Sequence, residues 1–313
     1  MARAKDTGPV LRKRITARWI WNTYKYPLLF LAPWIIGLLV FSVYPIFRSL
    51  YLSFTNFNLF EDPSFLGLEN YKTLFTDPRF LKSFSVTAIY VLLGVPLQLG
   101  FALLLALVLN QKVPGLKFFR AIYYLPALLG GSVAIAVLWR QVFGIEGIFN
   151  QFLGMLGAPE SLTSISWITN PKYSLYTLIL LRVWQFGSPM IIFLAGLKQI
   201  PPELYESASI DGANAFRKFT RITLPMLSPI IVFNLIMQII SAFQSFTPAY
   251  IVGGVDGGAL DSMLFYTLYL YNLGFVYYKM GLASAMAWIL MIVIAVFTVI
   301  VLRSTSKITY YSD

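Results

Sequence analysis

Cysteine and histidine are both absent from the 313-residue sequence. Their absence excludes disulfides, zinc sites built from Cys and His, and any Ser-His or Cys-His catalytic arrangement. Charged residues are scarce as well: they make up 12% of the chain, against about 25% in a typical soluble domain. Hydrophobic residues make up 58%. This composition predicts an all-α protein embedded in a lipid bilayer.

Six apolar stretches are long enough to cross about 30 Å of hydrocarbon as helices, and this predicts a polytopic membrane protein with six transmembrane helices. The first stretch follows a basic segment, but it is too long for a signal peptide and no small-x-small cleavage site follows it, so we expect a retained signal anchor. The aromatic segment Ser262–Leu273 is too short to span, and we expect an interfacial or partly inserted helix there. The predicted spans are Leu28–Leu50, Phe84–Leu109, Phe118–Val142, Ser174–Leu197, Leu224–Phe246 and Gly281–Leu302.

The formal charge of +11 has an explanation in the membrane topology. If both termini are cytoplasmic, the inner segments and their borders hold 16 basic and five acidic residues, and the outer ones hold seven basic and eight acidic residues. This asymmetry follows the positive-inside rule, so no nucleic-acid partner is needed to explain the charge. We therefore predict a basic cytoplasmic segment over residues 1–27, a transmembrane domain over 28–302 and a cytoplasmic tail over 303–313.

The cytoplasmic loop over residues 200–225 has the pattern of a docking element. Pro201 and Pro202 open a helix, where a missing N–H does no harm. Gly212 then ends that helix, and a second short basic helix is expected to stop before Pro225. Small residues on one face allow a partner to approach closely, and the carboxylates can pair with arginines of that partner. An ordinary solvated amphipathic loop has the same shape, so shape alone leaves both interpretations open.

The residues of this loop resemble a known motif. Glu206-Ser-Ala-x-x-Asp211-Gly-Ala213, followed by Ile222-Thr-Leu-Pro225, is similar to the EAA loop of binding-protein-dependent ABC importer permeases, with Ser207 in place of the first alanine. The resemblance implies that the loop couples the chain to an ATPase. The residues that it assigns to coupling are Glu203, Glu206, Ser207, Ala208, Asp211, Gly212, Ala213, Leu224 and Pro225.

Other segments resemble the carbohydrate-uptake members of that family. Phe65–Tyr71 and Leu194–Leu197 look like segments of the maltose- and glycerol-phosphate-type permeases, and within these of the first of two unlike permeases. The turn Val252–Gly258 departs from the family's usual T-G-G-G-P. The resemblance implies the type I ABC importer permease fold in the bacterial inner membrane. It also implies four kinds of partner: a second homologous permease, two ATPase subunits, an external solute-binding protein and membrane lipids.

The chain itself has no G-x-x-x-x-G-K-[ST] phosphate loop. We therefore expect no cofactor in this chain and no enzymatic activity, with ATP and magnesium bound by the partner ATPase. Two other classes of function remain to be compared. A secondary transporter coupled to protons or sodium would usually carry intramembrane acids, and the six predicted spans contain none. An intramembrane enzyme would lack a general base. The nearest alternative is an ABC permease for another solute, such as a polyamine or an amino acid.

Two groups of polar residues inside the predicted spans are candidates for the solute pathway. Arg182 lies in the fourth span with Trp184 and Gln185, and an ionised side chain there is unfavourable by at least roughly 2–3 kcal/mol unless it is paired or hydrated. It either contacts solute, for which an acidic saccharide would suit it, or it snorkels or bonds to helix carbonyls. In the fifth span, Asn234, Gln238 and Ser241 form one polar stripe that Gln244 continues, and this stripe serves either solute contact or helix association.

Overall fold

The computed structural model describes residues 17–111 and 115–305 of the chain. Of the segments predicted to be cytoplasmic, residues 1–16, 112–114 and 306–313 lie outside the described part. The chain divides into two units, residues 1–51 and 52–313, and each is described by itself. In the first unit, α1 (Ala17–Leu38) continues through a π-helical turn (Leu39–Val43) into α2 (Tyr44–Leu52). Its apolar stretch Leu29–Leu52 is long enough to cross a membrane and buries no residue within the chain.

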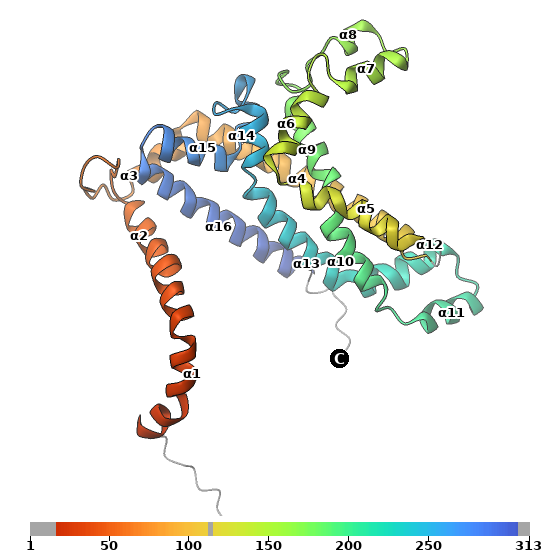
Figure 1. The fold of residues 1–313 in the computed structure, drawn as a ribbon, viewed down its shortest axis with the longest axis horizontal. Helices are drawn as coiled ribbons and strands as arrows, with labels where there is room; N and C mark the ends of the chain where they lie inside the picture. The colour runs from red at the N-terminus through yellow and green to blue at the C-terminus, as the bar shows by residue number, and fades with distance from the viewer. Residues whose placement is uncertain (1–16, 112–114, 306–313) are drawn as a thin grey trace, which may run out of the picture. The chain divides into compact units, whose positions relative to one another are not determined.

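The second unit is a bundle of helices, and within the described ranges its only β-pairing is an isolated bridge between Thr55 and Phe65 (Figure 1). The long helix α4 packs against α9, α10 and α13, and α16 packs against α13. The helices are α3 (Glu69–Thr76), α4 (Pro78–Leu109), α5 (Leu116–Leu129), α6 (Val133–Val142), α7 (Ile148–Met155), α8 (Glu160–Thr163), α9 (Ser174–Trp184), α10 (Gly187–Leu197), α11 (Pro202–Ile210), α12 (Ala215–Lys218), α13 (Leu224–Phe243), α14 (Thr247–Gly253), α15 (Tyr266–Tyr271) and α16 (Met280–Thr305).

Four continuous helices in the described part are long and apolar enough to span a membrane: Leu29–Leu52, Pro78–Leu109, Ala215–Phe243 and Met280–Thr305. The predicted third and fourth spans are not continuous helices. The third is broken into α5 and α6 with a bend of 96°, and the fourth into α9 and α10 with a bend of 40°. If each bent pair is one span, the total is the predicted six.

The sequence around the 96° bend explains why the helix stops there. The backbones of Gly130 and Gly131 lose more conformational entropy in a helix than those of other residues. Each glycine therefore destabilises a helix by about 1 kcal/mol relative to alanine. Ser132 then starts α6 as its N-cap, because its hydroxyl accepts a hydrogen bond from the backbone N–H of Ile135 at 3.3 Å. The two halves are therefore separate helices with their own ends, and the third span was wrongly predicted as one helix.

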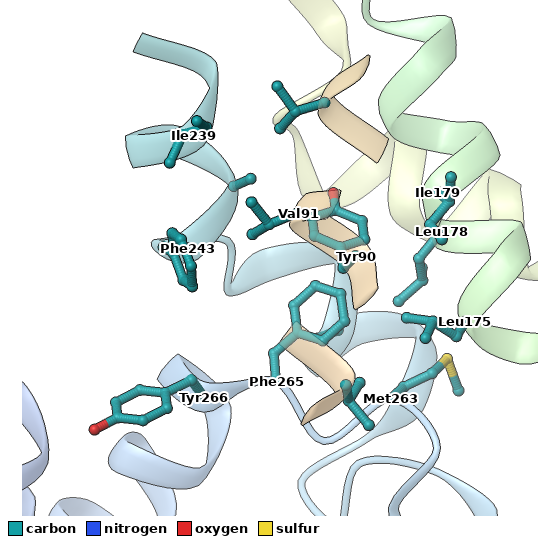
Figure 2. Close-up of a cluster of buried hydrophobic side chains, with 14 of the residues drawn as sticks. Tyr90, Val91, Leu175, Leu178, Ile179, Ile239, Phe243, Met263, Phe265 and Tyr266 are labelled. Carbon is teal, nitrogen blue, oxygen red and sulfur yellow. The ribbon is translucent and has the colours of Figure 1, made fainter. Parts of the chain in front are cut away.

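The core of the second unit gathers around α4. Figure 2 shows Tyr90 and Val91 of α4 between Leu178 and Ile179 of α9 and Phe243 of α13. The segment Ser262–Leu273, expected to be an interfacial or partly inserted helix, enters this core: Met263 to Tyr266 are each at most 1% exposed. Backbone and side-chain bonds hold it there, since Tyr266 N donates to Thr87 Oγ1 at 2.8 Å and Tyr266 Oη donates to Met286 O at 2.8 Å. The Tyr266 ring can be buried because its hydroxyl has this hydrogen-bond partner.

An ion pair closes the loop that leads into this segment. Arg79, at the start of α4, donates to both carboxylate oxygens of Asp261, at 2.8 and 3.2 Å. Asp261 has a positive φ of 54°, an uncommon conformation for a residue with a side chain. Nearby, Tyr269 donates to Asp77, the N-cap of α4, and burial together with this hydrogen bond raises the pKa of the Tyr269 phenol. The start of α4 and the segment 253–278 are thus held together by charged contacts.

Candidate functional site

The loop over residues 200–225 folds as the sequence predicts up to Gly212. Pro201 is the N-cap of α11 and Pro202 its first residue, and Gly212 follows the helix with a φ of +75°. Ala213 N then donates to Ala208 O at 2.9 Å, which closes the turn. Asn214 caps α12 by accepting a hydrogen bond from Arg217 N at 2.8 Å. The result is two short helices joined by a glycine bend.

The second helix does not end before Pro225, as the sequence suggested. α12 runs through a π-helical turn (Phe219–Thr223) directly into α13, so that residues 215–243 form one continuous helix. Pro225 is compatible with this continuity because a π-helical turn rearranges the backbone bonds at the position where proline lacks an N–H. The loop is therefore connected to the fifth span without a flexible joint, and Leu224 and Pro225 lie at that connection.

Two side-chain contacts fasten α11 to this continuous helix. The hydroxyl oxygens of Tyr205 and Thr223 lie 2.9 Å apart, and Lys218 Nζ donates to Ser209 Oγ at 2.7 Å. Sequence reasoning missed Tyr205 and Thr223, although a tyrosine in a short amphipathic helix is a candidate for a buried contact. These bonds make α11 and the foot of α13 one structural unit.

Three of the predicted docking residues, Ala208, Asp211 and Ala213, line an open hollow of about 350 Å³. Glu203, Glu206 and Ser207 are exposed on α11, and Asp211 and Gly212 are exposed after it, while Ala208 and Ala213 are half-buried. Within the described ranges, neither Glu206 nor Asp211 forms an ion pair with the neighbouring arginines. The hollow is lined by Ala208, Asp211, Ala213, Arg217, Lys218, Arg221 and Ile222. Its charges are therefore available to a partner protein.

Arg182 is buried between helices, with 6% of its surface exposed. Its Nη2 donates to the backbone oxygen of Gln238 at 2.8 Å and to the side-chain oxygen of Gln238 at 3.0 Å, and its guanidinium lies 5.5 Å from the centre of the Tyr90 ring. Of the two interpretations from the sequence, this geometry matches an arginine bonded to a helix carbonyl. Gln238 thus joins α9 to α13.

The other two candidates in the fourth span, Gln185 and Trp184, have different surroundings. Gln185 occupies the break between α9 and α10, where its Nε2 donates to Gly130 O at 2.8 Å. Its own backbone oxygen accepts a bond from Gln98 Nε2 at 3.1 Å. Trp184 is half-buried and packs at 6.0 Å from the ring of Trp139. Sequence reasoning missed Gln98, which could have been found as the single amide of an otherwise apolar second span.

The other residues of the polar stripe, on α13 and directly after it, differ in their burial. Asn234 is completely buried, and neither polar atom of its side chain has a hydrogen-bond partner within the described residues. Ser241 and Gln244 are exposed. The structure therefore brings Arg182 and Gln238 together and leaves Ser241 and Gln244 on an open surface. Among the described residues no group of three or more Asp or Glu side chains could hold a metal ion.

Comparison with known proteins finds relatives over most of the chain. Residues 75–308 match the model of the family described as binding-protein-dependent transport system inner membrane component. The chain is 50% identical over 285 residues to a probable ABC transporter permease protein, YesP, of Bacillus subtilis, covering 91% of each chain. It is 35% identical over 283 residues to the arabinooligosaccharides transport system permease protein AraP of the same organism, covering 88% of this chain and 87% of the relative.

A solved structure has the same fold. The bacterial alginate ABC transporter, crystallised with its alginate pentasaccharide-bound periplasmic protein, contains a chain that superposes with a TM-score of 0.78 at 24% identity. The superposition covers 94% of this chain and 99% of that chain. It establishes the type I permease fold for the helices described above.

Proposed function

The chain belongs to the family of binding-protein-dependent transport system inner membrane components, and from this premise we propose that it carries a sugar or oligosaccharide across the membrane, driven by a separate ATPase that docks on the loop over residues 200–225. As a member of this family it is a multi-pass permease subunit and not an enzyme. The proposal concerns its cargo, its coupling residues and the identity of its partners.

The observation that carries the proposal is the continuity between the loop and the fifth span. The exposed carboxylate of Asp211 lines a hollow that a partner can enter, and Glu206 is exposed on the same helix α11. The helix that leaves the hollow runs unbroken from Ala215 to Phe243. A partner that moves α11 therefore moves a whole transmembrane helix, because Tyr205 and Lys218 bind the two elements together. Mechanical coupling of this kind needs no ATP site in the chain itself, and ATP and magnesium are assigned to the partner.

A carbohydrate cargo is supported by the names of the relatives and by the side chains of polar and aromatic residues in the fourth and fifth spans. AraP is named for arabinooligosaccharides, and a relative from Rhizobium radiobacter, 34% identical, is named as a lactose permease. Trp184 provides an aromatic face, and the exposed Ser241 and Gln244 provide hydrogen-bonding groups of the kind that pair with sugar hydroxyls. Arg182 is bonded to Gln238 through two neutral oxygens, and its Nε has no hydrogen-bond partner among the described residues, so its charge would still suit an acidic saccharide.

The proposed assembly contains a second, homologous permease, two ATPase subunits and an external solute-binding protein. The charge reversal Glu206→Lys tests the docking role, because it places a cation where an arginine of the ATPase would bind. We expect the tagged variant to lose co-purification of the ATPase and uptake of labelled oligosaccharides in the native host. Glu146→Lys, which reverses an exposed acid far along the chain, is the matched control.

Retention of both the ATPase and uptake in Glu206→Lys would refute the docking role. Uptake of polyamines or amino acids by the wild-type complex, without uptake of any saccharide, would refute the carbohydrate cargo and leave the docking role standing.

A further inference from the structure

Gln185 contacts both of the broken spans of the second unit. It is the first residue after α9, at the 40° break before α10, and its side-chain amide donates to the backbone oxygen of Gly130 at the 96° break between α5 and α6. The fit is close: a Cβ added to Gly130 would lie 2.2 Å from Cγ of Gln185. Glycine is therefore required at the first break by the side chain that comes from the second.

A second close approach lies next to the first. A Cβ added to Gly187, the first residue of α10, would lie 2.9 Å from the Cβ of Ala127 and 3.0 Å from the backbone oxygen of Tyr123. The start of α10 thus packs directly on the backbone of α5. Because both contacts involve backbone atoms, the angle at one break cannot change without displacing the other helix pair or breaking these contacts.

The hydrogen bonds at Gln185 also supply partners for carbonyl groups at the helix breaks, which have no partner within their own helix. The oxygen of Gly130 lies at the end of α5, and the oxygen of Gln185 lies at the end of α9. The first accepts from the Gln185 amide, and the second accepts from Gln98 Nε2 of α4. In a bilayer no water is at hand to replace such bonds, so an open carbonyl is costly. The amides of Gln98 and Gln185 therefore stabilise the two breaks.

The same region is connected to the docking loop. Arg182, one turn before Gln185 on α9, is bonded to Gln238 of α13. Its side chain also packs on α4, where a Cβ added to Gly94 would lie 3.1 Å from its Cδ. α13 is the helix that continues without interruption from Ala215 at the docking loop. A chain of direct contacts thus leads from the loop through Gln238, Arg182 and Gln185 to Gly130.

We propose that Gln185 is a positioning residue that makes the two broken spans change their angles together when α13 moves. This inference rests on the proposed coupling of the loop to an ATPase. It assigns to Gln185 a role through Gly130 and α10, without contact to the transported solute. The movement is transmitted because the side-chain amide of Gln185 donates to Gly130 at the 96° break, while the backbone of Gln185 itself forms the 40° break.

Because this chain has no cysteine, spin labels can be placed in it at chosen positions, and the full importer complex is labelled after any cysteines of the partner subunits are replaced by serine. Leu125→Cys and Leu138→Cys place labels on exposed positions of α5 and α6, on either side of the 96° bend. Val108→Cys and Ile210→Cys, also exposed, report on the docking loop. Distances within each pair are measured by double electron–electron resonance with and without ATP, in the parent and in Gln185→Met. Gln141→Met, the same change at an exposed amide of α6, is the control.

In the parent and in the Gln141→Met control, we expect ATP to shift the distances in both pairs. In Gln185→Met the loop pair should still shift, the bend pair should no longer shift, and transport per ATP hydrolysed should fall about tenfold, the equivalent of one hydrogen bond. A bend pair that shifts equally in Gln185→Met, or one that is static in the parent while the loop pair moves, would overturn the positioning role. A static loop pair in the parent would instead overturn the proposed function, and this inference with it.

Gln98→Met extends the test if the first variant does not assemble. It removes the bond to the backbone oxygen of Gln185 and leaves residue 185 unchanged. We expect a broader distance distribution at the bend pair with an unchanged loop pair. An unchanged distribution at the bend would contradict the proposed role of these amides.

Discussion

The hydroxyl oxygens of Tyr205 and Thr223 lie 2.9 Å apart, and this contact joins α11 to the π-helical turn at the foot of α13. Tyr205 is half-buried and Thr223 is buried, at 4% exposure. A hydrogen bond between such groups contributes about 1 kcal/mol. Its main consequence is mechanical, because a force applied to the exposed face of α11 reaches the fifth span through it.

Tyr205→Phe removes this hydroxyl and keeps the ring. We expect a loss of about 1 kcal/mol in stability and a lower ratio of solute transported to ATP hydrolysed, measured in reconstituted vesicles. Thr223→Val should have the same effect, and the double variant should lose no more than either single one. Full additivity of the two losses would show that the hydroxyls do not act on each other.

The contact between Arg182 and Gln238 gives a prediction about stability. Gln238→Leu removes one of the two acceptors of a buried guanidinium, and we expect the free energy of unfolding to fall by about 1–3 kcal/mol. Replacing both residues by leucine should cost less than the sum of the single changes, since it removes the buried charge as well. Thermal unfolding in detergent measures both. Ser241→Ala, an exposed change on the same helix, should stay within about 0.5 kcal/mol.

The ion pair between Arg79 and Asp261 gives a prediction about salt. The two side chains are 35% and 27% exposed, so the pair contributes only about 1 kcal/mol. Asp261→Asn removes the charge and keeps a side chain that tolerates the positive φ of this residue. We expect proteolysis of the segment 253–278 to become faster in the variant at low salt, and the difference from wild type to shrink at high salt. A difference that is independent of salt would indicate lost shape and not lost charge.

Apolar stretches indicated six spans because a bilayer demands long apolar helices, and the described residues contain four continuous helices of this kind, or six if each bent pair is one span. The sequence also predicted the bend at Gly212, where a glycine follows an amphipathic helix. Hydropathy does not show the 96° break, since Phe118–Val142 is apolar on both sides of Gly130, although Gly130-Gly131-Ser132 is a local signal for a helix end. The contact of the Gln185 amide with Gly130 could not be predicted, because the two residues are 55 positions apart in the chain.

The end of the loop at Pro225 could not be predicted from the sequence either. Pro225 suggested a helix end, and the structure instead passes it with a π-helical turn. Proline forbids one backbone bond, but tertiary packing of the fifth span decides whether the helix stops. In the same way, Arg182 and Gln238 were each found as polar residues in apolar spans, while their contact required the packing of α9 against α13.

Asn234 supplies the last prediction, because its buried amide has no hydrogen-bond partner within the described residues. An amide in this state is unfavourable by about 1–3 kcal/mol, so a side chain of similar volume without polar atoms should be more stable. We therefore expect Asn234→Leu to raise the melting temperature of the purified chain.

The amide would be retained because it gains a partner in another conformation of the transport cycle. Uptake by the Asn234→Leu variant should then fall about tenfold, the equivalent of one hydrogen bond. Met237→Leu, an exposed apolar change on the same helix, is the control and should alter neither quantity. A lower melting temperature in Asn234→Leu would contradict this prediction, since it would mean that the amide stabilises the resting structure.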